Sequence, residues 1–269
     1  MSGIPTPASA PQSFRENPVP KHLISFQLYS ARNFPPLETV LEGLAKIGYD
    51  AVEPYYPLYG DDAAGYRAKV DAAGLKTPTF HAPLDGVTGD TARFIDIAKT
   101  IGAHTIVIPY IGADDRPTDV DGWKKLGETL AKTAETAKAA GLGLGYHNHD
   151  FEYATLADGS RPIDHLIGNG VASELDLGWV ARAGKDVAPE IDRLASEIIA
   201  FHIKDIAPAG TTAEDGWADV GQGIVDWAGL WPHIAKAPKA GVLVAEHDNP
   251  ADWKRFAERS FAAIKSFAV

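Results

Sequence analysis

Eight short apolar segments alternate with longer segments of helical periodicity, and this alternation strongly limits the folds open to the chain. The apolar segments are rich in β-branched residues and are the predicted strands, at 23–28, 51–53, 76–80, 105–109, 142–147, 172–176, 198–204 and 241–246. Between them, apolar residues recur at steps of three and four, most clearly over 123–140, which predicts amphipathic helices. Eight strand–helix units in about 250 residues predict an α/β fold, a single-domain (β/α)8 TIM barrel over residues 22–269.

An open, doubly wound sheet is the alternative with the same alternation. That fold commonly places Gly-x-Gly-x-x-Gly after its first strand, and this chain has Leu28–Arg32 there instead. Glycine follows four of the helical segments, at Gly48, Gly74, Gly102 and Gly141. Glycine in that position is typical of a left-handed residue that ends a helix. These features favour the barrel.

Charge and composition exclude several classes of function. Asp and Glu number 36 against 25 Lys and Arg, a net charge of −11, and there is no cysteine. An acidic chain disfavours binding to nucleic acid or to anionic membranes, and the lack of cysteine excludes thiolate chemistry. No apolar run approaches the roughly 20 residues of a membrane span. Residues 1–21 contain five prolines and no signal-like apolar run, so we expect a Pro-rich arm on a cytoplasmic protein, with a homo-oligomer as a possibility.

Polar residues terminate almost every predicted strand. In a TIM barrel the loops after the strands form the active site, so these side chains should meet at one end. They are Gln27, Glu53, His81, Tyr110, His147, Asp176, His202 and Glu246, followed by His149 and Glu152 after the fifth strand and Lys204 after the seventh. Taken alone, Asp176 could cap the next turn and His202 could be a core histidine. Acidic or imidazole groups on successive strand ends favour a functional site.

Carboxylates and imidazoles without sulfur select hard or borderline divalent ions. We therefore expect one such ion as cofactor, with Mn²⁺ first and Mg²⁺, Co²⁺ or Zn²⁺ as alternatives. The ion could hold two neighbouring oxygens of a sugar and stabilise an enediolate, while a nearby side chain moves the proton. This is the chemistry of sugar isomerases, epimerases and eliminating enzymes, and it predicts a small-molecule sugar as substrate.

Four ordered motifs carry a resemblance to a known family. They are Gly145-Tyr-His-Asn-His-Asp-Phe-Glu152, Leu175-Asp-Leu-Gly-Trp-Val180, Phe201-His-Ile-Lys-Asp205 and Gly221-Gln-Gly-Ile-Val-Asp226. Together they resemble the xylose isomerase-like TIM-barrel superfamily, in its sugar phosphate isomerase/epimerase branch, over about residues 22–268. The resemblance implies a metal-dependent enzyme that acts next to a carbonyl group.

The resemblance also implies a ligand set. Members bind one divalent ion through residues that end strands five to eight, and Asp176, His202 and Glu246 match the last three of these. The strand-five glutamate common in epimerases is replaced by Tyr146-His147. The remaining ligand could then be His147, His149 or Glu152, of which we favour His147 or Glu152. Trp179 stands where related epimerases often have histidine.

Further roles are expected for residues around this ligand set. Glu152, His149 or Glu246 could take the proton, and Lys204 could stabilise an oxyanion or pair with Glu174, the interpretation that we favour. The predicted substrate contacts are Gln27, Glu53, His81, Tyr110, Trp179 and Trp217. Residues 206–223, which include five glycines and prolines around Trp217, are a predicted lid.

The predicted function is a metal-dependent isomerase or epimerase that abstracts a proton alpha to a carbonyl. The sugar is expected to be unphosphorylated, because no basic cluster occurs in the loops after strands seven and eight. A metal-dependent lyase is the alternative, since the Tyr-His-Asn-His motif also resembles inosose dehydratases and enzymes that eliminate groups from 3-keto-glycosides. A non-catalytic sugar-binding barrel is a weaker alternative. The net charge disfavours an endonuclease of the same superfamily.

Overall fold

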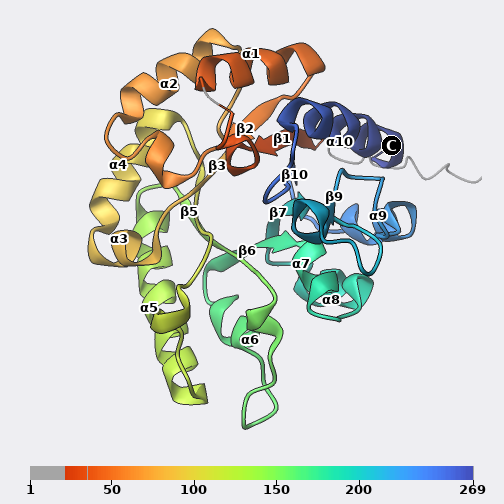
Figure 1. The fold of residues 1–269 in the computed structure, drawn as a ribbon. Helices are drawn as coiled ribbons and strands as arrows, with labels where there is room; N and C mark the ends of the chain where they lie inside the picture. Colours follow the sequence, from red (N-terminus) through yellow and green to blue (C-terminus); the bar gives the residue numbers. More distant parts are fainter. Residues whose placement is uncertain (1–21, 35, 269) are drawn as a thin grey trace, which may run out of the picture.

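The computed structural model describes residues 22–34 and 36–268 and contains a ring of eight parallel strands (Figure 1). The strand order is β2-β1-β10-β7-β6-β5-β4-β3. Between β2 and β3, backbone hydrogen bonds from Val52 N to Lys76 O and from His81 N to Pro54 O, both 2.9 Å, bring the two ends of the row together. The predicted barrel is thus confirmed. The predicted N-terminal arm, residues 1–21, lies outside the described residues.

The strands of the barrel occupy the predicted segments with small shifts. They are β1 Leu23–Gln27, β2 Ala51–Glu53, β3 Thr79–His81, β4 Thr105–Ile108, β5 Gly143–His147, β6 Val171–Asp176, β7 Ile198–Ile203 and β10 Val242–Ala245. The third strand is the most displaced from its prediction of 76–80. Pro78 has no N–H to donate to a neighbouring strand, so regular pairing begins only after it.

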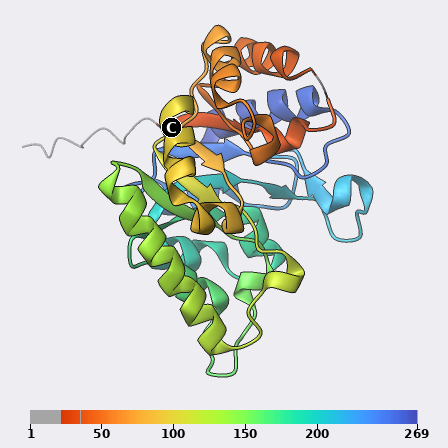
Figure 2. The same ribbon diagram turned by 90° about the vertical axis from the view of Figure 1, so that its left-hand side faces the viewer.

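Helices surround the ring of strands, as the two perpendicular views show (Figures 1 and 2). They are α1 Leu37–Ile47, α2 Ala63–Ala72, α3 Leu84–Gly89, α4 Thr91–Ile101, α5 Val120–Ala139, α6 Pro162–Leu166, α7 Leu177–Arg182, α8 Val187–Leu194, α9 Trp227–Ile234 and α10 Trp253–Phe267. The predicted glycine helix ends are confirmed, because Gly48, Gly74, Gly102 and Gly141 have φ angles of 115°, 73°, 78° and 82°. A side chain would be strained at each of them.

A short antiparallel hairpin was not predicted. It pairs β8, Asp205–Ile206, with β9, Trp217–Ala218, and so begins one residue before the predicted lid of residues 206–223. Strands of two residues are too short to show alternation in a sequence. The hairpin gives the 205–223 segment a fixed base at the end of the barrel to which the strands point (Figure 2).

The side chains inside the barrel change from apolar to ionic along the strands. Most of the buried apolar side chains form one large core, whereas Ala200, Val242 and Val244 form a separate small cluster. Because side chains alternate along a strand, His202 and Glu246 share the inward face of these residues, two positions further along. The barrel interior is therefore apolar toward the start of these strands and ionic toward their ends.

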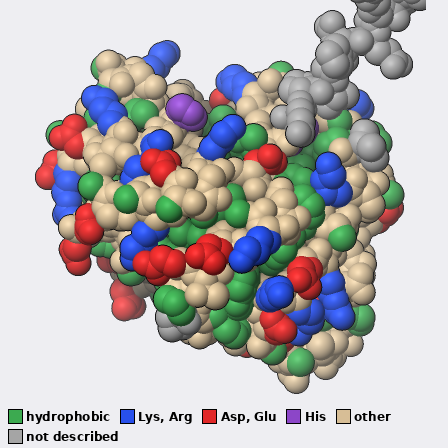
Figure 3. All heavy atoms as spheres, turned by 90° about the horizontal axis from the view of Figure 1, so that it is seen from above, with side chains coloured by type: hydrophobic (Ala, Val, Ile, Leu, Met, Phe, Trp, Pro, Cys, Tyr) green, Lys and Arg blue, Asp and Glu red, His purple; other side chains and the backbone are tan. Residues whose placement is uncertain are grey.

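The surface shows no block of one charge on the face that carries α1, α2 and α10. Acidic and basic side chains are interspersed there (Figure 3). Within the described part of the chain, no helix is long and apolar enough to cross a membrane.

Candidate functional site

The carboxyl ends of five strands bring titratable side chains together inside the barrel. All of them are buried. They are His81 on β3, His147 on β5, Glu174 and Asp176 on β6, His202 on β7, and Glu246 directly after β10. Six such groups in one buried volume require mutual pairing or a bound cation, since an isolated buried charge is costly.

The upper group consists of His147, Asp176, His202 and Glu246. Each offers one ligand atom, and these four atoms lie within 4.8 Å of one another. His202 Nδ1 is 2.8 Å from Glu246 Oε2, and His147 Nε2 is 3.8 Å from Asp176 Oδ2. Asp176 Oδ2 has no hydrogen-bond partner among the described residues although it is buried. Two imidazoles and two carboxylates around an unsatisfied oxygen fit a divalent ion.

Asp176 also caps the helix that follows it. Its Oδ1 accepts a hydrogen bond of 2.8 Å from Trp179 N at the start of α7. Asn148 fixes the same strand end from β5, because its side chain accepts from Asp176 N at 3.0 Å. The capping role and the ligand role are therefore compatible, since they use different oxygens of one carboxylate.

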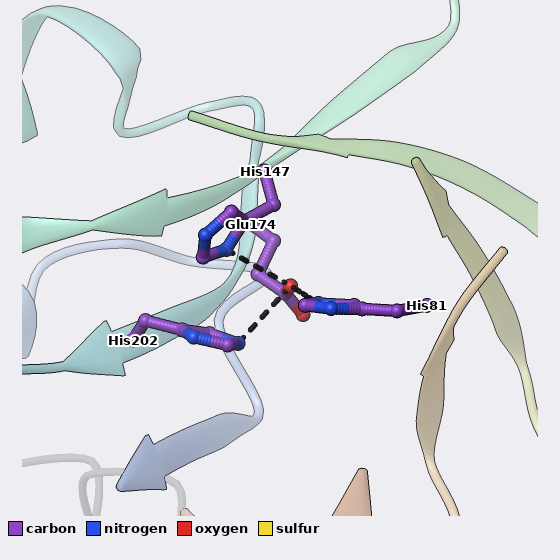
Figure 4. A group of neighbouring side chains, drawn as sticks. All are labelled: His81, His147, Glu174 and His202. Carbon is purple, nitrogen blue, oxygen red and sulfur yellow. Dashed lines mark hydrogen bonds and ion pairs between the residues drawn. The ribbon is translucent and has the colours of Figure 1, made fainter. Parts of the chain in front are cut away.

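The lower group lies one pleat deeper and consists of His81, His147, Glu174 and His202. Three imidazoles converge on one oxygen of Glu174 (Figure 4). Glu174 Oε2 is 2.7 Å from His81 Nε2, 3.1 Å from His202 Nε2 and 3.4 Å from His147 Nδ1. Glu174 is thus a central residue, although the sequence led us to expect it only as a partner of Lys204. The sequence does contain a signal for this role: Glu174 stands two residues before Asp176, so both side chains lie on the same face of the strand.

A second buried carboxylate supports the lower group. Glu53 Oε2 lies 2.8 Å from His202 Nε2 and 3.0 Å from His81 Nε2, and it accepts from Gln27 Nε2 at 2.7 Å. The hydroxyl of Thr79 donates to the other oxygen of Glu53. Gln27 and Glu53, both predicted as substrate contacts, are fully buried beneath the imidazoles.

Burial and neighbouring charges divide the histidines into two kinds. Burial alone would lower the pKa of His202, but the carboxylates of Glu174 and Glu53 outweigh it and hold that pKa well above its usual value. In the same way, these carboxylates overcome burial and raise the pKa of His81 to about 10. Burial and the neighbouring His202 lower the pKa of His147 to about 4. His147 is therefore neutral at pH 7, whereas His202 would have to release its proton to bind an ion.

Lys204 pairs with carboxylates in and beside the upper group. Its Nζ lies 2.5 Å from Asp248 Oδ1, 3.3 Å from Glu246 Oε2 and 3.9 Å from Asp176 Oδ2. The favoured pairing of Lys204 with Glu174 was wrong. In the β6–β7 register Glu174 lies opposite Ala200 and Asp176 opposite His202, so Lys204 extends beyond Asp176 and away from Glu174.

Two tryptophans cover Lys204. Its Nζ lies 4.4 Å from the ring centroid of Trp217 and 5.0 Å from that of Trp179. The two rings are 4.8 Å apart and meet edge to face. Trp217 is only 2% exposed. The ion pairs of Lys204 are thereby shielded from water, which strengthens them.

Glu152 is held outside both groups. Its carboxylate accepts hydrogen bonds from Tyr146 Oη at 2.6 Å and from His149 N at 2.8 Å. Burial raises the pKa of Glu152 to about 7. Of the three candidate ligands on strand five, the structure brings His147 into the upper group. Glu152 instead fixes the backbone that presents His149.

The 205–223 segment is anchored at both ends. The carboxylate of Asp205 accepts from the backbone N–H groups of Gly221 and Gly223 and from Trp227 Nε1. Further out, Arg255 on α10 binds Glu214 at 2.9 Å and Asp219 at 3.0 Å. The predicted lid therefore rests on the barrel, with Trp217 turned toward Lys204.

A cavity of about 430 Å³ opens above the upper group. Its inner end is formed by His81, His147, His149, Glu246 and Asp248. The predicted contacts His81 and Tyr110 line it, whereas Gln27 and Glu53 lie beneath it. Trp179 and Trp217 are not among its lining residues. The volume falls in the range of small-molecule sites.

The fold and the site together define a TIM-barrel protein with a buried carboxylate–imidazole group at the active-site end. The chain belongs to the xylose isomerase-like TIM barrel family, whose model matches residues 41–267.

One sequence relative and two solved structures illustrate what the chain is similar to. The chain is 23% identical to an inosose dehydratase of Lacticaseibacillus casei over 208 residues, which cover 66% of this chain and 68% of the relative. A sugar phosphate isomerase/epimerase of Parabacteroides distasonis has a similar structure, with a TM-score of 0.75, 19% identity and coverage of 97% and 98%. The IOLI protein, solved with a bound zinc atom, has a TM-score of 0.73, 15% identity and coverage of 91% and 98%.

Proposed function

We propose that the chain is a divalent-metal-dependent sugar isomerase or epimerase that removes a proton alpha to a carbonyl. The observation that carries this proposal is the upper group, in which four ligand atoms lie within 4.8 Å of one another and the buried Asp176 Oδ2 accepts no hydrogen bond from the described residues. Its position at the floor of a cavity gives a substrate access to the ion. Mn²⁺ is the ion that we propose, held by His147, Asp176, His202 and Glu246.

A bound divalent ion would supply Lewis-acid polarisation of a sugar carbonyl and charge stabilisation for the oxygens of the resulting enediolate. The side chains supply the remaining functions. His149 lines the cavity, and burial lowers its pKa well below the usual value, so it is a neutral base. The loop hydrogen bond to Glu152 orients it. Lys204 offsets the negative charge of Glu246 and Asp248 beside the developing enediolate.

The lining of the cavity supports an unphosphorylated substrate. Among the described residues that form it there is neither lysine nor arginine. Two buried cations of the site are already engaged: Lys204 by Asp248 and Glu246, and His81, whose pKa is raised to about 10, by Glu53 and Glu174. A phosphate dianion would therefore lack a partner in the cavity and would face two carboxylates.

A lyase is the second candidate, and the inosose dehydratase relative favours it. Both reactions begin with the same proton transfer. They differ in the fate of the enediolate, which is either reprotonated on carbon or expels a leaving group from the β-carbon. The same residues would serve either outcome.

Metal content is the first test. Mass spectrometry of the purified protein should find about one divalent ion per chain, and His202→Ala and Glu246→Gln should each lose it. The matched controls are His104→Ala and Glu258→Gln, which change exposed residues outside the groups described above. If the native protein binds no ion even after addition of Mn²⁺, the proposal fails.

Deuterium exchange then tests the reaction. The protein is incubated in D₂O with ketoses, inososes and 3-keto-glycosides, and the products are read by NMR. Deuterium at the alpha carbon without loss of a group indicates isomerisation or epimerisation, and loss of a β-substituent indicates a lyase. Absence of both across the panel would count against proton abstraction.

A further inference from the structure

The outer part of the cavity is built almost entirely from tyrosine and proline. Its lining residues there are Tyr29, Tyr55, Tyr56, Pro57, Pro83, Pro109 and Tyr110. We call these seven residues the tyrosine mouth. They come from the loops after β1, β2, β3 and β4, so they form a wall on one side of the barrel opening. The upper group needs only the inner end of the cavity, and the mouth is unused by the chemistry proposed above.

Arginines hold the tyrosines of the mouth in place. Arg32 lies 3.9 Å from the ring centroid of Tyr29. Arg93 Nη2 donates to Tyr56 Oη at 2.9 Å, and Arg116 Nη2 donates to Tyr110 Oη at 2.7 Å. Tyr29 and Tyr110 are nonetheless 39% and 47% exposed. Exposed aromatic rings that are fixed before a ligand arrives bind it at a reduced entropic cost.

The bracing arginines also determine what the mouth can recognise. Their guanidinium groups are directed to the tyrosines and are not among the residues that line the cavity. The hydroxyls of Tyr56 and Tyr110 are already engaged. The rings therefore offer flat apolar surfaces, which suit the C–H face of a pyranose or an aryl ring.

We propose that the tyrosine mouth is a binding subsite for a second ring, joined by a glycosidic bond to the sugar at the metal centre. The substrate class is then a glycoside, and a free monosaccharide is disfavoured. This inference rests on the proposed function for the placement of the first ring. The cavity of about 430 Å³ is continuous from the upper group to the mouth, since His147 and Glu246 line it together with the tyrosines.

Binding of unreactive ligands tests the subsite without turnover. Calorimetry of the Mn²⁺-loaded protein compares three derivatives of glucose and of galactose: the methyl β-glycoside, the phenyl β-glycoside, and the β-1,4-linked disaccharide (cellobiose or lactose). The two-ring ligands should bind about tenfold more tightly than the methyl glycoside. A gain for the phenyl glycoside alone identifies an aryl ring, and a gain for the disaccharide identifies a second sugar.

Variants localise that gain. Tyr110→Ala and Tyr29→Ala should each reduce the advantage of the two-ring ligands, whereas Tyr110→Phe should keep it because the ring remains. Ile224→Ala, at an exposed residue that does not line the cavity, is the control and should change nothing. Equal binding of all three ligands, or no detectable binding of any, overturns the proposal.

The same titrations separate this inference from the proposed function. They are repeated on metal-free protein and on Glu246→Gln. If no ion binds and no proton exchange occurs, but the two-ring advantage persists and depends on Tyr110, the subsite stands and the proposed reaction fails. If metal and exchange are present without any two-ring advantage, the reaction stands and the subsite is refuted.

Discussion

Nε2 of His202 lies 3.1 Å from Oε2 of Glu174, while Nδ1 on the other side of the ring lies 2.8 Å from Glu246. His147 has a similar arrangement, with Nδ1 toward Glu174 and Nε2 toward Asp176. Both imidazoles therefore join the lower group to the upper group. A carboxylate behind a metal-bound histidine fixes its ring and raises its basicity. Glu174 would serve two histidines in this way if they hold the proposed ion.

Replacement of Glu174 tests this arrangement. Glu174→Gln should keep the shape of the side chain but weaken metal binding by about 10–100-fold, whereas Asp176→Asn should abolish it. The Kd is measured by competition with a chelating dye, and Glu258→Gln is the control. If the order is reversed, so that Glu174→Gln abolishes binding and Asp176→Asn only weakens it, the ion is bound by the lower group instead.

The pH dependence of stability tests the environment of Glu152. Because burial raises its pKa to about 7, the folded protein favours the protonated form. The resulting stabilisation is complete below the unfolded pKa of about 4.3 and is lost as the pH rises to about 7. Relative to Glu152→Gln, the wild type should therefore lose up to about 3 kcal/mol of unfolding free energy between pH 4 and 8. Urea unfolding at each pH measures this, and a constant difference would contradict it.

Removal of the charge on Lys204 should lower the free energy of unfolding. Lys204→Met keeps most of the volume but leaves Asp248 without its cation and Glu246 with His202 alone. Breaking a buried pair in this way costs roughly 3–5 kcal/mol. Lys185→Met, at an exposed lysine, provides the comparison. Equal unfolding free energies for the two variants would show that Lys204 is not needed to balance these carboxylates.

Substitutions of Trp217 test whether the predicted lid contributes to turnover. Trp217→Ala opens a path for water to Lys204, so turnover should fall by about tenfold or more. Trp217→Phe retains an aromatic ring and should fall less. The measurement is kcat and KM on the substrate found by deuterium exchange. Unchanged values for both constants in Trp217→Ala would remove the lid from the mechanism.

The sequence predicts the barrel well because the barrel depends on local patterns. Buried parallel strands appear in the sequence as runs of apolar, β-branched residues. The helix ends at Gly48 and Gly102 follow from backbone sterics, because glycine accepts a positive φ angle. The upper group could be assembled from strand ends and the family resemblance. The partner of Lys204 could not, because it depends on the register between β6 and β7. The histidine partners of Glu174 could not be predicted for a similar reason, because they come from three other strands.

The tyrosine mouth could not be predicted from the sequence. Tyr110 was expected to contact substrate, but Tyr29, Tyr55 and Tyr56 follow their strands in turns whose shape the sequence does not reveal. The bracing of Tyr56 by Arg93 spans 37 residues. Contacts at that separation are set by how α4 packs against the loop after β2, which no local periodicity encodes.

The lower group has a consequence for how the barrel folds. Glu53 and His81 come from the first three strands, whereas Glu174 and His202 come from the sixth and seventh strands of the barrel. Each half pairs some of these groups internally, Glu53 with His81 and Glu174 with His202. The contacts of His81 with Glu174 and of His202 with Glu53 form only when the two halves meet. A half-formed barrel would leave these buried groups without their cross-half partners, so such intermediates are disfavoured. The ionic centre thus makes assembly of the two halves cooperative, and a fragment that ends before β6 is expected to remain unfolded.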